Sequence, residues 1–297
     1  MDGILLIDKP CGITSHDVVD RIRRVAGTRR VGHTGTLDPA ATGLLILCLG
    51  QATRLSDFLI GMDKVYEGTM RLGVVTDSYD LDGSVVERRA VPEGLTRDRI
   101  QAECNRFVGT IQQTPPMVSA VKVGGERLYK LARKGETVER AARSVTVREF
   151  SVLEYASPDA VFRVRCTRGT YARSLCHDVG MALGCGAALA ALRRTAVGPH
   201  GIAAALPLDR FVGPEDVVDR LLPPEMALTL PEVRVFAHCE RLVGCGGALH
   251  PADIEGFFPM ESGWVQVKTR SGRLLAVAEV TAGPQGFCLQ PRRVLVG

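Results

Sequence analysis

Residues 32–43 read Gly32-His33-Thr34-Gly35-Thr36-Leu37-Asp38-Pro39-Ala40-Ala41-Thr42-Gly43, and the apolar run Leu44–Leu47 follows at once. Loops carry function when a rigid element holds them, and the apolar run predicts a buried strand beside this glycine-rich loop. Because Asp38 precedes a proline, its backbone is held extended. The run therefore predicts a carboxylate that a loop presents to a ligand. The ordinary alternative is a helix start, with Asp38 as the N-cap and Pro39 in the first turn.

Length and composition indicate an ordinary globular protein. The chain has 297 residues, of which 45% are hydrophobic and 24% charged, so it has room for two domains with sizeable cores. It contains no apolar run long enough to span a bilayer. Its N-terminus, Met1-Asp2-Gly3-Ile4, lacks the pattern of a signal peptide. We therefore expect a cytoplasmic protein that does not act at a membrane.

The nine cysteines are scattered singly along the chain. No C-x-x-C pair occurs and the number is odd, so the sequence predicts neither a zinc site nor a disulfide framework. We expect most of them to be small buried hydrophobic residues in a reducing compartment.

Basic residues gather on both sides of the Asp38 loop, although the formal net charge is only +4. Five arginines fall within residues 21–30, and residues 122–148 hold eight basic residues against three acidic ones. Such a cluster is often a solvated helix face. Two clusters that flank a candidate catalytic loop favour a surface that binds phosphate groups.

The pattern along the chain predicts interleaved strands and helices without a regular βαβ repeat, which is typical of an α+β fold. Strands are expected at residues 4–7, 44–47, 64–75, 145–154 and 160–167. Helices are expected at 15–26, capped by Ser15; at 51–60; at 96–108, capped by Thr96; and at 170–183, capped by Thr170.

The C-terminal part of the chain differs from the rest in composition and in its pattern of predicted elements. Prolines concentrate near residues 210–232 and mark a linker, after which short β-like segments alternate with glycine turns. We therefore expect one domain over residues 1–230 and a small all-β module over residues 231–297.

The run at 32–43 resembles the motif GHTGxLDPxATGxL of the TruB family of tRNA pseudouridine synthases. Further segments resemble motifs of that family in the family's own order, across roughly residues 3–198. They are Gly3–Pro10 with Gly12 and Ser15; Lys64–Tyr66 with Leu72 and Gly73; Pro115–Met117 with Ser119, Ala120, Lys122, Gly125, Leu128 and Tyr129; Arg168–Arg173; and Leu192–Arg194. Val118 departs from the pattern, because family members often carry tyrosine there.

The resemblance implies a fold and an activity. The fold would be a pseudouridine-synthase catalytic domain, with a mixed, largely antiparallel sheet flanked by helices, followed by a small PUA-like RNA-binding domain. The activity would be the isomerisation of uridine 55 in the T-loop of tRNA. We expect the T-arm stem-loop of tRNA as partner, no obligate protein partner and a monomer.

The resemblance also implies roles for single residues. Asp38 would be the nucleophile, Arg173 its ion-pair partner, and Tyr66 an aromatic that stacks on the target base and assists loss of its C5 proton. Substrate binding would involve His33, Lys9, Tyr171, Leu192 and Lys122. Without the resemblance, Arg173 would be expected to pair with Asp178 or solvent, Tyr66 to lie in the core, His33 to satisfy backbone groups, and either lysine to be a surface residue or a brace for the site.

The reaction explains why these residue types suffice. Pseudouridine forms when the C–N glycosidic bond breaks, the base turns, and the ribose joins C5 instead of N1. No electrons or groups enter or leave overall, so we expect no cofactor and no metal. A carboxylate can attack either C1′ of the sugar or C6 of the ring, and both remain open. With an ordinary pKa of about 3.9, Asp38 would be ionised at neutral pH.

Three alternatives have different sequence requirements. A guide-RNA-dependent relative of the dyskerin type is expected to carry terminal extensions and basic tails, which this chain does not show. A cysteine-based RNA methyltransferase would need a glycine-rich donor turn, and no G-x-G-x-x-G occurs. A non-catalytic RNA-binding module would not need the aspartate, tyrosine and arginine together, although a second activity as a tRNA-folding chaperone stays open.

Overall fold

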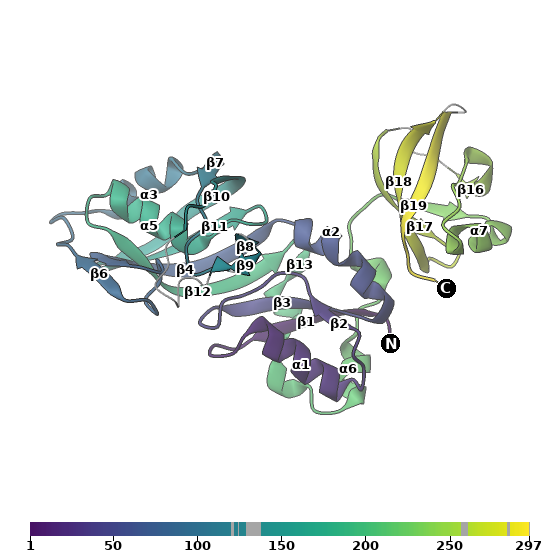
Figure 1. Ribbon diagram of the computed structural model, residues 1–297, viewed down its shortest axis with the longest axis horizontal. Coiled ribbons are helices and arrows are strands. Elements are labelled where there is room, and N and C mark those ends of the chain that lie inside the picture. The colour runs from purple at the N-terminus through teal and green to yellow at the C-terminus, as the bar shows by residue number, and fades with distance from the viewer. Residues whose placement is uncertain (120–121, 124, 129–137, 257–260, 284–285, 297) are drawn as a thin grey trace.

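Two β-sheets organise the chain (Figure 1), and the computed structural model describes all residues except 120–121, 124, 129–137, 257–260, 284–285 and 297. The larger sheet has ten strands. In spatial order they are β14 (Leu206–Pro207), β1 (Gly3–Lys9), β3 (Thr42–Leu49), β12 (Ala187–Val197), β4 (Lys64–Leu72), β11 (Asp159–Cys166), β10 (Arg143–Ala156) and β7 (Gly109–Gln113), with β2 (Val31–His33) beside β3 and β13 (His200–Gly201) beside β12. Among the described strands of this sheet, the parallel pairs are β1–β14 and β3–β12, which confirms the expected mixed, largely antiparallel sheet.

Helices and two short hairpins accompany the two sheets. The α-helices of the described residues are α1 (Ser15–Val25), α2 (Ser56–Gly61), α3 (Arg97–Asn105), α5 (Ala172–Ala182), α6 (Pro214–Arg220) and α7 (Glu240–Gly244), and a 3-10 helix, η1 (Gly50–Leu55), precedes α2. The hairpins are β5 (Val74–Thr76) with β6 (Val85–Arg88), and β8 (Lys122–Val123) with β9 (Glu126–Arg127).

Strands β1 and β3 lie at the centre of the N-terminal half and are buried on both faces. Alternate residues point to opposite sides of a strand, so Leu5 and Ile7 pack in one cluster with α1, while Ile4 and Leu6 pack in another. A strand covered on both faces has to be apolar throughout. This explains the continuous apolar runs at residues 4–7 and 44–47.

The β4–β11–β10 half of the sheet is covered on one face. Helices α3 and α5 pack there, and Phe162, Val164 and Leu175 belong to the same buried cluster. Along each strand, charged side chains alternate with these apolar ones and point to the opposite face. Arg163 of β11 is one of them, and its side chain is 46% exposed. Helices α3 and α5 therefore lie on one face of this half of the sheet, and the charged side chains lie on the other.

Some predicted element boundaries are wrong, for identifiable reasons. The N-cap of α1 is Thr14 instead of Ser15, and that of α5 is Tyr171 instead of Thr170. The strand expected at 64–75 breaks at Gly73, whose φ of +83° interrupts the extended backbone. The helix expected at 51–60 is divided into η1 and α2.

The C-terminal β region is a five-stranded sheet. Its spatial order is β16 (Ile254–Glu255), β15 (Glu232–Val235), β17 (Gly263–Lys268), β18 (Leu274–Gly283) and β19 (Gly286–Val294). Leu274 and Val277 of β18 belong to a buried cluster that also contains Ile4 and Leu55, so the two sheets share a core. Phe58 of α2 meets Trp264 of β17 edge to face, with ring centroids 4.9 Å apart. Within the described residues, no helix is both long and apolar enough to cross a membrane.

Candidate active site

The loop between β2 and β3 is anchored on both sides of Asp38. On one side, the backbone N–H of buried Leu37 donates to Ser15 Oγ at 2.8 Å, and that hydroxyl donates to the Leu37 carbonyl at 3.1 Å. On the other side, the Pro39 carbonyl accepts the Gly12 N–H at 2.9 Å. Asp38 is thus held between two fixed neighbours while its own side chain remains 52% exposed.

A glycine is required where this loop enters β3. Gly43 has a φ of +101°, and a Cβ atom there would lie 2.3 Å from the Arg194 carbonyl oxygen of β12. Any larger residue would push β3 and β12 apart. The close approach brings the loop beside the Arg193–Arg194 segment, where β3 and β12 pair in parallel.

Lys9 supports the loop from below. Its side chain is fully buried, and Nζ donates to the carbonyl oxygens of Pro10 at 2.9 Å, Ile13 at 2.7 Å and Pro39 at 3.2 Å. These three acceptors satisfy the three N–H groups of an ammonium, and burial lowers the pKa of Lys9. The residue expected to bind substrate is therefore enclosed by protein and braces the Asp38 loop instead.

Arg173 joins two aspartates that are far apart in the sequence. It is the second residue of α5 and its side chain is only 5% exposed. Nη2 lies 3.1 Å from Asp38 Oδ2, and Nη1 lies 3.1 Å from Asp80 Oδ2. The expected Arg173–Asp38 pair is present, and the alternative partner Asp178 is not used.

Electrostatics at Asp38 are a balance of opposing effects. Burial raises the pKa of Asp38 above its ordinary value, and the carboxylates of Asp80 and Asp82 act in the same direction, whereas Arg173 and Lys9 oppose the rise. Arg173 therefore limits the rise in the pKa of Asp38 that burial and the neighbouring carboxylates cause.

The side chain of Asp38 lines a cleft of about 270 Å³ on the helix-covered face of the sheet. Four of the other predicted site residues line it: Tyr66 of β4, Tyr171 before α5, Arg173 of α5 and Leu192 of β12. Burial raises the pKa of Tyr66, and Asp38 adds to the rise while Arg194 opposes it, so Tyr66 stays a neutral phenol at neutral pH. The wall of the cleft thus combines a carboxylate, a buried guanidinium and two aromatic rings.

His33 is a predicted binding residue that does not line the cleft. His33 ends β2, and its Nδ1 accepts the Gly35 N–H at 3.4 Å, while burial lowers its pKa. Lys122 begins β8, but its side chain lies outside the described part of the chain, as do residues 120–121, 124 and 129 of the segment expected to contact RNA. The position of Val118, where tyrosine is frequent in the family, is 38% exposed.

Three residues to which the sequence assigned no role belong to the site, although Lys64 and Arg194 lie within the family-like motifs. Asp80 pairs with Arg173; its signal was the acidic stretch Asp77–Asp82 that follows β5. Arg194 is 2% exposed under the cleft, and its Nε and Nη2 donate to the carbonyls of Leu44 and Gly35 at 2.7 and 3.0 Å. Lys64 also lines the cleft, and burial, with Arg194 nearby, lowers its pKa to about 8.

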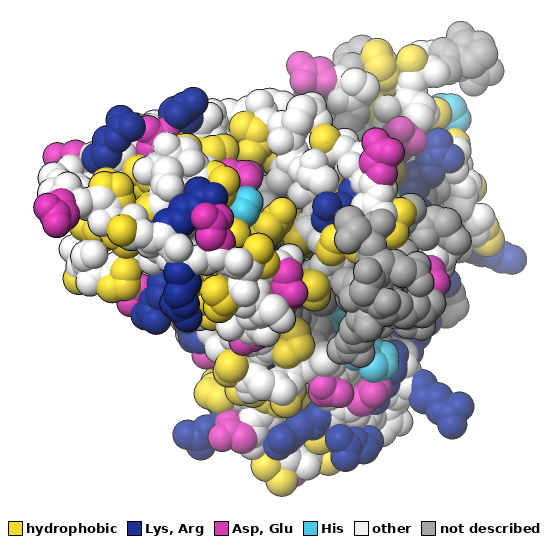
Figure 2. All heavy atoms as spheres, turned by 60° about the vertical axis from the view of Figure 1, so that its left-hand side comes forward, with side chains coloured by type: hydrophobic (Ala, Val, Ile, Leu, Met, Phe, Trp, Pro, Cys, Tyr) yellow, Lys and Arg dark blue, Asp and Glu magenta, His cyan; other side chains and the backbone are white. Residues whose placement is uncertain are grey.

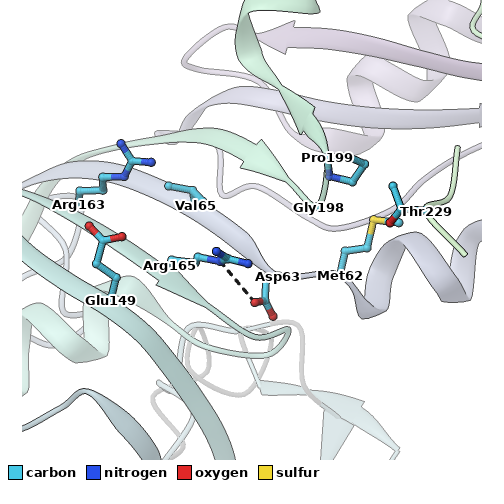
Figure 3. Close-up of a pocket in the computed structure, with 9 residues that line it drawn as sticks. All are labelled: Met62, Asp63, Val65, Glu149, Arg163, Arg165, Gly198, Pro199 and Thr229. Atoms are coloured by element: carbon cyan, nitrogen blue, oxygen red, sulfur yellow. Dashed lines mark ion pairs between the residues drawn. The ribbon is translucent and has the colours of Figure 1, made fainter. Parts of the chain in front are cut away.

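A second hollow of about 430 Å³ lies on the opposite face of the sheet (Figure 3). Strand alternation places Val65 in this hollow and its neighbours Lys64 and Tyr66 in the cleft. Its arginines are already paired: Arg165 Nε lies 3.5 Å from Asp63 Oδ2 and Arg163 Nη1 lies 3.9 Å from Glu67 Oε1. Compensated charges of this kind stabilise an exposed sheet face and provide no excess charge for a phosphate.

Over the part of the chain that the structure describes, no group of three or more His, Cys, Asp and Glu side chains is arranged to hold a metal ion. The two aspartates that come together at Arg173 are bridged by that guanidinium instead.

Two family models match the chain. Residues 23–172 match the N-terminal domain of the TruB family pseudouridylate synthases, and residues 173–229 match the C-terminal domain of tRNA pseudouridylate synthase B. The tRNA pseudouridine synthase B of Burkholderia mallei (strain NCTC 10247) is 44% identical over 306 residues, covering 100% of this chain and 97% of that protein. That of Thermobifida fusca (strain YX) is 46% identical over 290 residues, covering 95% and 96%.

Solved structures show the same fold. A chain of an H/ACA ribonucleoprotein bound to a substrate RNA containing 2′-deoxyuridine superposes with a TM-score of 0.74 at 27% identity, covering 99% of this chain and 85% of that one. A chain of an archaeal box H/ACA Nop10–Cbf5 complex gives a TM-score of 0.73 at 28% identity, covering 99% and 86%.

Proposed function

The chain belongs to the TruB family of pseudouridylate synthases and is an isomerase, and from this premise we propose that it converts uridine 55 in the T-loop of tRNA to pseudouridine with Asp38 as nucleophile. The observation that carries the proposal is the ion pair between Arg173 and Asp38 at the wall of the cleft. A charged carboxylate held in one orientation beside a space for a base is what nucleophilic attack on a nucleotide requires.

The target nucleotide has to leave the T-loop before Asp38 can reach it. Extruding a base costs a few kcal/mol, which binding elsewhere on the RNA must offset. The ring of Tyr66 then stacks on the uracil, and Tyr171 and Leu192 close the sides of the cleft. These residues supply the apolar surface, because stacking on aromatic rings holds an unstacked base.

Asp38 then forms a transient bond with C1′ of the ribose or with C6 of the ring. The bond between N1 and C1′ breaks, the uracil turns within the cleft, and C5 joins C1′. The proton on C5 leaves at the end and N1 takes up a proton, so no atoms are gained or lost overall. Tyr66 assists this proton transfer, and Asp38 is released unchanged. Arg173 orients Asp38 and stabilises its charge before the attack and after the release.

The identity of the RNA rests on relatives. Proteins 44% and 46% identical over nearly their whole length are named tRNA pseudouridine synthase B, which supports tRNA as substrate. The structures from H/ACA complexes are 27% to 29% identical. We therefore infer a stand-alone enzyme that needs neither a guide RNA nor an obligate protein partner, works as a monomer, and acts in the cytoplasm.

Contacts to the rest of the tRNA would come from outside the cleft. On the face of the molecule that Figure 2 shows, Lys and Arg side chains are scattered among acidic ones and do not gather in one patch. We assign Lys122 to the phosphate contacts and His33 to the space that the extruded base leaves. The region from residue 231 onward is proposed as a PUA-like RNA-binding domain, with residues 1–230 forming the catalytic domain.

One assay tests the substrate and its position. The protein is incubated with unmodified tRNA and without added cofactor, and pseudouridine is mapped at each position. We expect modification at position 55 alone, and none in a matched tRNA that carries cytidine there. Pseudouridine at other positions, or only after a guide RNA is supplied, would contradict the proposal. A chaperone activity would appear as faster tRNA refolding that Asp38→Asn retains.

A further inference from the structure

The loop that carries Asp80 is attached to α5 at two points. Arg173 and His177 are four residues apart on α5 and so lie on one face of that helix. Arg173 Nη1 lies 3.1 Å from Asp80 Oδ2. The preceding residue, Tyr79, stacks its ring on the imidazole of His177, with centroids 4.0 Å apart and planes inclined by 19°.

The backbone at Tyr79 adopts a conformation that a tyrosine rarely takes. Its φ is +67°, and Tyr79 is the non-glycine residue with positive φ within the described residues. A side chain in this left-handed region is strained, and glycine or asparagine avoids most of the strain. Strain of this kind persists where the surrounding contacts enforce it. The contact that requires a ring here is the stack on His177.

Further contacts fix the Asp80 loop along the cleft. The Leu189 N–H donates to the Tyr79 carbonyl at 2.9 Å, and the Leu81 N–H donates to the Leu189 carbonyl at 2.9 Å. Leu189 itself lines the cleft. Ser78 Oγ donates to Asp80 Oδ1 at 2.5 Å, so one oxygen of Asp80 faces the loop and the other faces Arg173.

His177 contacts Tyr79 by stacking. Its Nδ1 is buried without a hydrogen-bond partner. Burial lowers the pKa of His177, and the charge of nearby Arg89 lowers it further, so the imidazole is neutral at neutral pH. A neutral ring stacks face to face on a phenol without the cost of a buried charge.

We propose that Tyr79 and His177 are positioning residues: their stack fixes the loop so that Asp80 holds one arm of Arg173 and leaves the other arm aimed at Asp38. The inference rests on the proposed function, because it states that the stack sets the angle at which Arg173 meets Asp38, the proposed nucleophile. Neither Tyr79 nor His177 lines the cleft, so loss of the stack lowers the rate of the chemical step and leaves tRNA affinity unchanged.

The test compares two variants that lack the ring of Tyr79 with one that keeps a ring. Tyr79→Gly removes the ring and suits the left-handed backbone, Tyr79→Asn does the same with a side chain retained, and Tyr79→Phe keeps the ring. Single-turnover rates and Kd are measured with unmodified tRNA. We expect Tyr79→Gly and Tyr79→Asn to lose about tenfold in rate, comparable to the value of one aromatic pair. Their Kd stays within twofold, and Tyr79→Phe restores the wild-type rate.

A second background shows whether the stack acts through Asp80. In the Asp80→Asn variant, Tyr79→Gly should cause no further loss of rate, because the two residues act in one chain of contacts. Full multiplication of the two losses would overturn the inference, as would a wild-type rate in Tyr79→Gly. A wild-type protein that makes no pseudouridine would overturn the proposed function instead, so the two failures are distinguishable.

Discussion

Nη1 of Arg173 lies 3.1 Å from Oδ2 of Asp80, while its other terminal nitrogen meets Asp38 at the same distance. A guanidinium is planar and rigid, so two carboxylates on its two arms fix the direction of both contacts. One of these carboxylates is 19% exposed and the other 52%. The more enclosed aspartate serves to hold the arginine, and the more exposed one remains available to a ligand.

Removal of Arg173 tests its role directly. Arg173→Ala should lower the single-turnover rate by about 10²–10³-fold, the usual effect of removing one preorganised donor from an active site. The Kd for tRNA should remain within threefold, because Arg173 faces Asp38 instead of the phosphate surface. Arg165→Ala is the matched control, since Arg165 is also paired to an aspartate but lies in the hollow on the other face. Equal losses of rate and affinity in Arg173→Ala would reject the assignment.

The substitution Asp80→Asn is expected to shift the pH profile of kcat/KM. Burial raises the pKa of Asp38, and the negative charge of Asp80 raises it further. Activity requires the ionised carboxylate and falls as pH drops through this pKa. Neutralising Asp80 lowers the pKa of Asp38, so the acid limb of kcat/KM should move to lower pH. The plateau rate should fall about tenfold, because Arg173 loses a charged partner.

The control for this profile is Asp82→Asn. Asp82 raises the pKa of Asp38 less than Asp80 does and makes no ion pair with Arg173 in the described structure, so it should move the limb less and retain the plateau. An acid limb that moves to higher pH in Asp80→Asn would contradict the electrostatic account.

Lys9→Met tests whether Lys9 braces the loop. The change removes the donor to three carbonyl groups around a buried ammonium, and should lower the free energy of unfolding by about 2–3 kcal/mol. Urea denaturation measures this loss. Arg24→Met, on the exposed surface of α1, should change it by less than about 0.5 kcal/mol. Unchanged stability together with weakened tRNA binding would return Lys9 to the ligand surface.

Lys122 is expected to contact RNA phosphates. Lys122→Gln should weaken tRNA binding and reduce the slope of log Kd against log salt, by roughly 0.9 for each lost contact on duplex-like RNA. Titrations at several salt concentrations measure the slope. Arg163→Gln is the control, since Arg163 is paired with Glu67 in the hollow on the other face of the sheet. A slope equal to that of the wild type would remove Lys122 from the phosphate surface.

Local sequence patterns predicted the parts of the structure that local interactions determine. The buried strands β1 and β3 follow from unbroken apolar runs, and the loop of Asp38 follows from its glycines and proline. The resemblance to a family supplied Arg173, because nothing in residues near 173 indicates a partner at position 38. Ser15 and Thr170 failed as helix caps because long-range or neighbouring acceptors use their hydroxyls: Leu37 for Ser15 and Thr167 for Thr170.

Long-range contacts account for what the sequence could not predict. Asp80 reaches Arg173 only because β12 holds the 77–84 loop through Leu189. Lys9 appears as an ordinary lysine beside a proline, and its burial arises when residues 10–13 and 39 close around it. The left-handed backbone of Tyr79 has no signal in its residue type. Each of these depends on segments that meet only in the folded chain.

The carboxylate of Asp38 is the group on which the whole account depends. Asp38→Asn keeps the size and the loop anchors of the residue while removing the charge that attacks the nucleotide. The decisive measurement is pseudouridine formation at position 55 in a single turnover, alongside the Kd for the same tRNA. The account predicts no detectable product in Asp38→Asn with an affinity within threefold of the wild type. Product formed at the wild-type rate would contradict it.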